Sequence, residues 1–368
     1  PSERSYPKEA RLAHESVSEQ NSSGDTSTLR DAFPGMQLGC AVGGRLPDGL
    51  AAAERELLLR HFGVLTPENC MKPGPIHPTP QGFHFEDADR LVAFAGAHGL
   101  RVVGHCLAWH QQCPDWFYAG RSRSEALQQL ESHIATVAGR YRGQLQGWDV
   151  VNEAIADRGT GLRDTPALQA IGDDYVLRAF EFARAADPEA ELYYNDYNIE
   201  EPGKRDRTLR LLEQLKNAGA RIDGVGIQGH WQLDQVPFEQ VRTAIEAYRN
   251  LDLKVMITEL DLDVVDRPDC GADVSVLRAY TPQEDLYREG CPAPVLARQA
   301  EQYARLFEIF REGAVSRVSF WGLHDGRTWL NSWPGKRTNH PLLFDRECRP
   351  KPAYQALLAA AEGRPAHG

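Results

Sequence analysis

The stretch QGWDVVNE, residues 146–153, contains the pattern on which the fold prediction depends. A short apolar run ends there in an amide and a carboxylate, Asn152 and Glu153. The stretch KVMITELD, residues 254–261, repeats the pattern and includes Glu259. Short apolar runs are typical of strands that are buried on both faces, as in parallel sheets. We therefore interpret both stretches as parallel strands with polar side chains at their carboxyl ends.

Outward from these two stretches, short apolar runs alternate with longer segments of helical periodicity. Eight runs are strand candidates: residues 37–42, 63–66, 101–106, 146–151, 191–195, 224–228, 254–258 and 317–321. Helical segments between and after them include residues 49–62, 125–141, 175–187, 204–219, 295–310 and 351–363. No GxGxxG motif follows the first run, which argues against a nucleotide-binding sheet. Eight strand–helix units instead predict an α/β fold, a single (β/α)8 TIM barrel.

The length and composition fit one catalytic domain with short extensions. A chain of 368 residues is an ordinary length for a barrel. Residues 1–30 are polar and rich in Ser and Glu, so we expect a poorly ordered leader or linker there. The catalytic domain is expected over residues 31–362, followed by a C-terminal tail at 363–368.

The charge and the apolar runs of the chain argue against two classes of partner. The formal net charge is −11 and no Lys/Arg cluster stands out, so a nucleic acid would be repelled. No apolar run reaches the roughly 20 residues that cross a membrane. A neutral partner such as a polysaccharide fits this composition.

The seven cysteines do not have the paired spacing of a zinc site, so we expect no metal. Cys270 and Cys291 flank one polar loop, and we predict a disulfide between them in an oxidising compartment. The remaining five are expected to be reduced: Cys40, Cys70, Cys106, Cys113 and Cys348.

Catalytic side chains of barrels of this type follow the carboxyl ends of the strands. Here those positions hold carboxylates, imidazoles, amides and indoles instead of ordinary loop residues. They are Glu68, Asn69, His105, Trp109, Asn152, Glu153, Asn195, Tyr197, Gln228, His230, Glu259, Asp261, Trp321 and Trp329.

This set predicts the cleavage of a glycosidic bond, which requires one carboxylic acid and one facing carboxylate. Either Glu153 or Glu259 alone would be interpreted as a capping or salt-bridging residue. Together with Asn152, which could hold a sugar hydroxyl, and with His230 and Asp261, which could orient Glu259, they indicate an active site. The indoles of Trp109, Trp321, Trp329 and Trp333 offer flat apolar faces for sugar rings.

Other enzyme classes explain the sequence less well. A metal hydrolase would need a short ligand spacing such as HExxH, and a serine hydrolase would need a GxSxG elbow; neither occurs. A thiol nucleophile at Cys106 would need His105 as its base. None of these alternatives explains the tryptophans.

The motifs along nearly every strand resemble glycoside hydrolase family ten, the barrel xylanases, over roughly residues 30–362. They occur in the order of that family: TPENCMK, RVVGHCLAWHQQCP, GWDVVNEAI, ELYYNDYN, IDGVGIQGHW, VMITELDLD and TNHPLLFDRECRPKPAY.

The resemblance implies a retaining endo-β-1,4-xylanase without a cofactor, in which Glu153 is the acid/base and Glu259 the nucleophile. It implies that Asp261 supports His230 behind the nucleophile, and that Tyr197 stacks on the aglycone side. Glycone contacts are implied for Glu68, Asn69, Lys72 and Gln112. Contacts around the sugar that is cleaved are implied for His105, Trp109, Asn152, Gln228, His230, Trp321 and Trp329. The expected partner is xylan or a xylo-oligosaccharide, and the expected protein is an extracellular or periplasmic monomer.

The chain departs from the family pattern at several places in or near the expected cleft. Pro73 stands where a tryptophan is usual, and His324 stands where a small or hydroxylated residue is usual. Cys106 replaces a common threonine. The loop at residues 266–292 is an insertion near the cleft. We expect these departures to affect specificity more than the reaction.

Two alternatives remain at this point. A barrel endo-β-1,4-glucanase would use the same pair of carboxylates and would be distinguished by its activity on cellulose. A non-catalytic carbohydrate-binding barrel would be expected to have lost Glu153 or Glu259, and both are present.

Overall fold

The computed structural model describes residues 28–45, 48–266 and 285–363. The sheet of these residues has nine strands. Pairing of β1 with β9 and of β6 with β8 closes all except β7 into a parallel barrel. The barrel strands are β1 (Gln37–Val42), β2 (Val64–Pro67), β3 (Arg101–Trp109), β4 (Gly147–Asn152), β5 (Glu191–Asp196), β6 (Gly224–Ile227), β8 (Lys254–Asp263) and β9 (Arg317–Phe320). The predicted (β/α)8 barrel is confirmed, and every predicted strand coincides with one of these.

The remaining strand, β7 (His230–Gln232), pairs with the distal part of β8. Its register places His230 opposite Asp261. The sequence pattern did not indicate this strand, because it is three residues long and polar. It nevertheless fixes the position of a predicted site residue.

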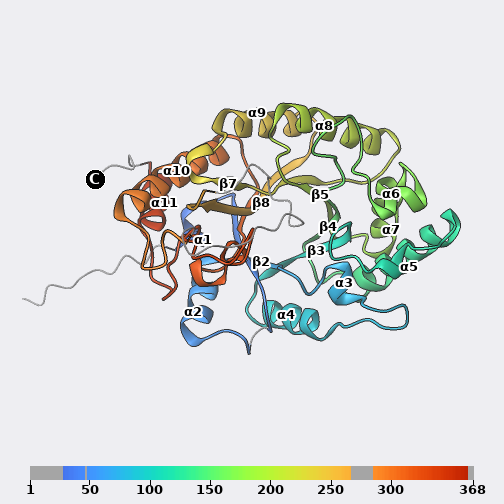
Figure 1. Cartoon of the computed structure of the whole chain (residues 1–368), viewed down its shortest axis with the longest axis horizontal. Coiled ribbons are helices and arrows are strands. Elements are labelled where there is room, and N and C mark those ends of the chain that lie inside the picture. Colours follow the sequence, from blue (N-terminus) through green and yellow to red (C-terminus); the bar gives the residue numbers. More distant parts are fainter. Residues whose placement is uncertain (1–27, 46–47, 267–284, 364–368) are drawn as a thin grey trace, which may run out of the picture.

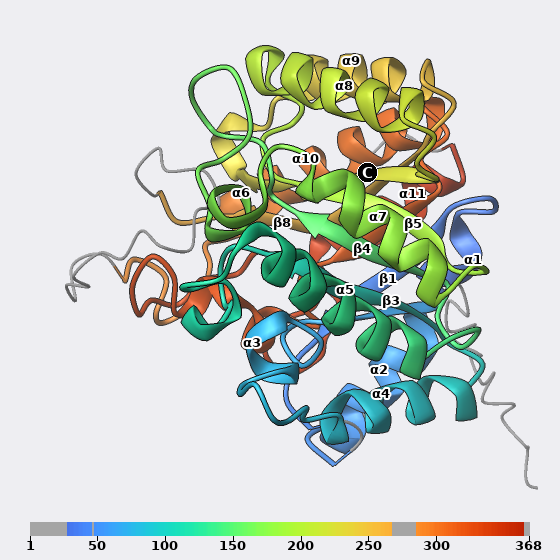
Figure 2. The same cartoon turned by 90° about the vertical axis from the view of Figure 1, so that its right-hand side faces the viewer.

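The helices form a layer around the barrel (Figures 1 and 2). The start of α5 (Arg123–Arg140) is fixed by a capping box, in which the Ser122 and Glu125 side chains each accept the backbone N–H of the other residue. The helices are α1 (Leu29–Ala32), α2 (Ala52–His61), α3 (Pro73–Ile76), α4 (Glu86–Ala97), α5 (Arg123–Arg140), α6 (Pro166–Ile171), α7 (Tyr175–Ala186), α8 (Pro202–Asn217), α9 (Phe238–Arg249), α10 (Ala293–Glu312) and α11 (Pro352–Ala361).

Two apolar regions hold the strands in place. A large cluster fills the space between strands and helices, and a second, smaller cluster consists of Val64, Val103, Tyr193 and Met256 from four strands. Trp148 of β4 packs so closely over Gly104 of β3 that a Cβ at Gly104 would lie 2.2 Å from the indole. Glycine is therefore required at this position of a buried strand.

The ends of the chain and the cysteines complete the description. The boundary expected near residue 30 lies inside α1, where Leu29 is fully buried. Cys291 is a free thiol, whereas its predicted disulfide partner Cys270 lies outside the described residues, as does most of the 266–292 loop. The five cysteines expected to be reduced are free. Within the described ranges, no helix is long and apolar enough to cross a membrane.

Candidate active site

The two predicted catalytic carboxylates lie at one end of the barrel and are connected by amide side chains. Glu153 directly follows β4, and Glu259 lies in β8. The Asn195 amide donates hydrogen bonds to Glu259 (2.8 Å) and Asn152 (2.9 Å), and the Asn152 amide donates to Glu153 (3.2 Å). Both carboxylates are nearly buried, with 6% of Glu153 and 5% of Glu259 exposed. The structure therefore brings together the pair that the strand positions predicted.

Glu153 lies in surroundings that favour its protonated form. The Trp109 indole donates to Oε2 at 2.8 Å, and the Gln228 amide donates to Oε1 at 2.9 Å. Burial and then the negative charge of Asp196 raise the pKa of Glu153 to about 7, although the two hydrogen bonds oppose this shift. Glu153 is therefore a carboxyl group that holds its proton close to neutral pH.

Glu259 lies in surroundings that favour its charged form. His230 Nε2 is 3.1 Å from Glu259 Oε2, and His230 Nδ1 is 3.0 Å from Asp261 Oδ2. Burial opposes a charge on Glu259, but the hydrogen bond from His230 and the nearby charge of His105 lower its pKa below the ordinary value. Burial also opposes a charge on His230, yet Asp261 and Glu259 raise its pKa to about 9. The expected support of Glu259 by His230 and Asp261 is thus present as an ion-pair chain.

His105 is held beside the carboxylates by a second buried pair. Its Nδ1 lies 2.9 Å from Asp149 Oδ2, and both side chains are almost fully buried. The indole of Trp321 meets the imidazole edge-on, with ring centroids 5.2 Å apart. This arrangement fixes the orientation of the His105 ring within β3.

The expected glycone residues lie at the neighbouring strand ends. Lys72 is buried, donates to Asn69 Oδ1 at 3.1 Å, and its Nζ lies 4.8 Å from the centroid of the Trp109 ring. Burial raises the pKa of Glu68, while the charge of Lys72 opposes the shift. Gln112 is exposed at the rim. Lys72 thus links the glycone residues to the group around Glu153.

The tryptophans expected to contact sugar are tied to the nucleophile side. Trp329 Nε1 donates to Asp261 Oδ2 at 2.8 Å, and its ring lies 4.9 Å from that of His230. The indole of Trp333 stacks on Trp329 at 4.6 Å between centroids. Trp329 is half-buried, so part of its surface remains open to a ligand.

Tyr197 differs from the expectation for an aglycone stacking residue. Only 2% of it is exposed, because Lys204 Nζ covers its ring at 3.7 Å from the centroid. Its hydroxyl donates to Asp157 at 2.7 Å and accepts from Arg163 at 2.9 Å. In this structure the ring is therefore part of a buried ionic network and presents no face for stacking.

The structure accommodates Pro73 at the start of a helix and Cys106 in the core, two of the departures from the family pattern. Pro73 begins α3 as its first residue, where a missing N–H costs no hydrogen bond. The next residue, Gly74, donates to the Gln112 carbonyl, and a Cβ at Gly74 would lie 2.4 Å from that oxygen. Cys106 is fully buried, and burial raises the pKa of its thiol well above the ordinary value. Such a thiol is a poor nucleophile.

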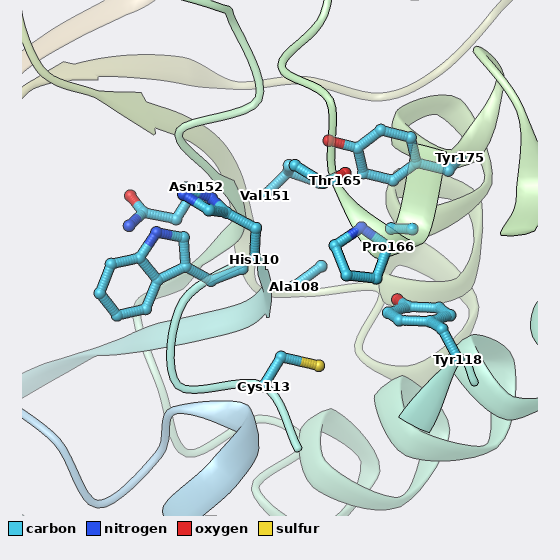
Figure 3. A pocket seen from close by; sticks show the side chains of 11 residues that line it. Ala108, His110, Cys113, Tyr118, Val151, Asn152, Thr165, Pro166 and Tyr175 are labelled. Atoms are coloured by element: carbon cyan, nitrogen blue, oxygen red, sulfur yellow. The ribbon is translucent and has the colours of Figure 1, made fainter. Parts of the chain in front are cut away.

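Asn152 also lines a mostly apolar pocket (Figure 3). Its lining includes Val151, Pro166, Tyr118, Tyr175 and the thiol of Cys113. Across the described part of the chain, no cluster of three or more His, Cys, Asp or Glu side chains could hold a metal ion.

Three residues that support the site were not predicted as site residues. Asn195 lies near the carboxyl end of β5 and was noted only as one of the polar strand ends. Asp149 and Asp196 lie within or at the end of apolar strands, and a carboxylate inside such a run is the signal that would have found them. Both are almost fully buried.

A parallel barrel with two buried carboxylates of opposite proton affinity, surrounded by amides, imidazoles and indoles at its carboxyl end, is typical of glycoside hydrolases. Comparisons with known proteins agree. The profile of Glycosyl hydrolase family 10 matches residues 28–360. The chain belongs to this family, so the resemblance found in the sequence is confirmed.

Several members of the family are similar along most of their length. A beta-1,4-xylanase of Dictyoglomus thermophilum is 41% identical over 306 residues, which is 82% of this chain and 83% of that protein. A thermostable celloxylanase of Thermoclostridium stercorarium is 36% identical, and the matched region covers 92% of this chain and 89% of that protein. A solved endoxylanase from a sugarcane soil metagenome superimposes with a TM-score of 0.86 at 37% identity, covering 90% of this chain and 99% of the other.

Proposed function

We propose that this protein is an endo-1,4-β-xylanase that cleaves internal bonds of xylan with retention of the anomeric configuration. The observation that carries the proposal is the opposite tuning of two connected carboxylates. Burial and Asp196 raise the pKa of Glu153 to about 7, whereas His230 and His105 lower the pKa of Glu259 despite its burial. One group suits proton donation and the other suits nucleophilic attack. Family membership and the names of the relatives support the choice of substrate.

In the first step, a Glu259 oxygen attacks the anomeric carbon from the face opposite the leaving sugar. The bond to the glycosidic oxygen breaks, and that oxygen takes the proton of Glu153. An ester between the sugar and Glu259 results. Because the charge of Glu259 disappears, Glu153 loses one of the repulsive charges that raised its pKa and becomes ready to act as a base.

In the second step, Glu153 removes a proton from water, and the resulting hydroxide attacks the anomeric carbon on the face that the leaving group vacated. The ester bond breaks and Glu259 recovers its charge. Two inversions give net retention. The direct test follows xylotetraose hydrolysis by proton NMR, and we expect the β-anomer to accumulate first. Initial formation of the α-anomer would contradict the double displacement.

The Trp109 indole gives a prediction about pH dependence. The reaction needs Glu153 protonated, so kcat/KM should decline as pH rises through the Glu153 pKa of about 7. Trp109 donates to the Glu153 carboxylate, and Trp109→Phe removes a bond that stabilises the charged form. We expect the basic limb of the profile to move to higher pH by up to about one unit.

The matched control for this shift is Trp116→Phe. Trp116 donates its indole N–H to the backbone carbonyl of Pro78, so the substitution also removes one indole hydrogen bond. The basic limb of this variant should stay in place. A limb of Trp109→Phe that moved to lower pH would show that the indole does not stabilise the Glu153 carboxylate.

The second prediction concerns the choice between xylan and cellulose. An endo-β-1,4-glucanase stays the second candidate, because one relative is named a celloxylanase. Gln112, Trp321 and Trp329 match family positions that crowd the place of the extra hydroxymethyl group of glucose. We therefore expect kcat/KM on xylotetraose to exceed that on cellotetraose by about 100-fold or more. Comparable efficiency on the two tetrasaccharides would reject the xylan preference. Pro73→Trp, which restores the residue usual in the family, would then be the first variant to measure.

We further propose that the protein acts as a monomer outside the cytoplasm, where polymeric xylan is found. Light scattering of the purified protein measures the oligomeric state. The products from plain, arabinose-decorated and glucuronic-acid-decorated xylan would define the side chains that the cleft accepts.

A further inference from the structure

A cavity of about 330 Å³ lies beside the glycone residues, between the loop after β1 and the loop after β9. Its lining includes Gly43, Glu68, Arg327, Trp329 and Ser332. Carboxylate, guanidinium and hydroxyl groups around an indole are the combination that binds a sugar ring. Arg327 has no part in the reaction described above, so its position in this lining indicates another role.

The Arg327 side chain is held rigidly by a carboxylate from a distant part of the chain. Its Nε donates to Glu54 Oε1, and its Nη2 donates to Glu54 Oε2 (2.8 Å) and to the Gly49 carbonyl (2.6 Å). Such a two-pronged contact fixes the plane of the guanidinium. Among the described residues, the third nitrogen, Nη1, has no protein acceptor. The side chain is 36% exposed, and Arg327 lines the cavity.

Glu54 is itself saturated by four donors. Oε1 accepts from Arg327 Nε and His324 Nε2, and Oε2 accepts from Arg327 Nη2 and the backbone N–H of Ala51. A carboxylate offers about four acceptor positions, and all of them are used here. The hydrogen bond from Arg327, opposed by burial, holds the pKa of Glu54 at about 2. The carboxylate is therefore charged well below neutral pH.

His324 supplies one of these donors, which explains its presence at this position. Its Nδ1 accepts the backbone N–H of Gly326 at 3.1 Å, so the ring hydrogen must be on Nε2. Nε2 then donates to Glu54 at 2.8 Å. The departure from the family pattern at His324 thus completes the clamp on Arg327.

Arg327 and Trp329 both line this cavity, but different parts of the molecule hold them. The Trp329 ring lies 4.9 Å from that of His230, which contacts Glu259. Arg327 is held instead by Glu54 of α2, in the outer helical layer. We therefore place a sugar that contacts Arg327 further along the glycone side than one that contacts Trp329.

We infer that Arg327, positioned by Glu54 and His324, binds a hydroxyl group of the third xylose unit on the glycone side and thereby favours longer substrates. This inference rests on the proposed function. The free Nη1 of a guanidinium that is already immobilised loses little entropy when it binds a hydroxyl. Arg327 is therefore a specificity-determining residue, and Glu54 and His324 are positioning residues.

The test compares 4-nitrophenyl β-xylobioside with 4-nitrophenyl β-xylotrioside, which share a leaving group and differ by one glycone sugar. In the native protein we expect the larger kcat/KM on the trioside. In Arg327→Met we expect the ratio of trioside to bioside kcat/KM to fall about tenfold, the loss of one charged hydrogen bond. Arg327→Lys, which lacks the fork, and Glu54→Gln, which loosens the clamp, should lower the same ratio.

Arg178→Met is the matched control, since Arg178 also forms ion pairs with carboxylates, those of Asp174 and Glu181, but lies on α7. Its ratio should equal that of the native protein. An unchanged ratio in a folded Arg327→Met variant, or an equal loss on both substrates, would overturn the inference. Failure of the native protein to cleave either glycoside would instead reject the proposed function.

Discussion

Replacement of Glu259 by alanine is expected to abolish xylan hydrolysis, with kcat reduced on the order of 10⁴-fold or more. In the proposed mechanism Glu153 acts on the leaving-group side, so of this connected pair only Glu259 can form the glycosyl ester. Glu259→Gln, which keeps the shape of the side chain, should be as inactive as the alanine variant. Thermal unfolding of both variants checks that the loss is not a loss of fold.

Azide distinguishes a missing nucleophile from any other defect of Glu259→Ala. The truncation leaves space below the anomeric carbon, beside His230, whose positive charge favours an anion. With an aryl β-xylobioside, azide should occupy this space and displace the leaving group directly. The expected product is the α-xylobiosyl azide, of inverted configuration. A β-linked azide from this variant would mean that the roles of the two glutamates are exchanged.

The strands of the fold could be predicted because their information is local. Each barrel strand is a short apolar run, and the predicted 37–42 run reproduces β1 to the residue. Differences arise where polar residues continue a strand. β8 extends past Glu259 to Asp263, and there it pairs with the polar strand β7. Hydrogen bonding to a neighbour decides these extensions, and a pattern of hydrophobicity does not report it.

The proximity of Glu153 and Glu259 could be predicted because both glutamates end apolar runs and a barrel brings all strand ends together. The opposite shifts of their pKa values could not be predicted from the sequence. Burial raises the pKa of Glu153 most, and among the charges Asp196 contributes most. Which carboxylate lies near Glu153 depends on the register of β4 and β5. The same holds for Tyr197, whose burial results from the position of Lys204 in the first turn of α8.

The contacts of Glu54 with His324 and Arg327 show most clearly which part of the site the sequence could not predict. Glu54 is one of several charged residues in an amphipathic helix, and its sequence gives no reason to separate it from Glu56. Its partners His324 and Arg327 are 270 and 273 residues away. His324 was noticed as a departure from the family, but its role follows only from the contact between the two ends of the barrel sheet at β1 and β9.

Replacement of Glu153 by alanine is expected to have an effect that depends on the leaving group. Xylan needs a proton on its glycosidic oxygen, so its hydrolysis should fall by about 10² to 10⁴-fold. An aryl xylobioside with a good leaving group needs no acid, and Glu259 should still form the ester. Hydrolysis of the ester should then be slow, because no base activates water. A burst of the aryl alcohol followed by a slow steady state is the expected time course.

Azide should accelerate the slow phase of Glu153→Ala, because an anion needs no base to attack the ester. The attack comes from the face of the departed leaving group, so the product should be the β-xylobiosyl azide, of retained configuration. Glu200→Ala is the matched control, since Glu200 is also a buried glutamate that accepts an indole N–H, that of Trp231. It should show neither burst nor azide product. An α-linked azide from Glu153→Ala would assign the nucleophile to Glu153, and full activity on xylan would remove both glutamates from the reaction.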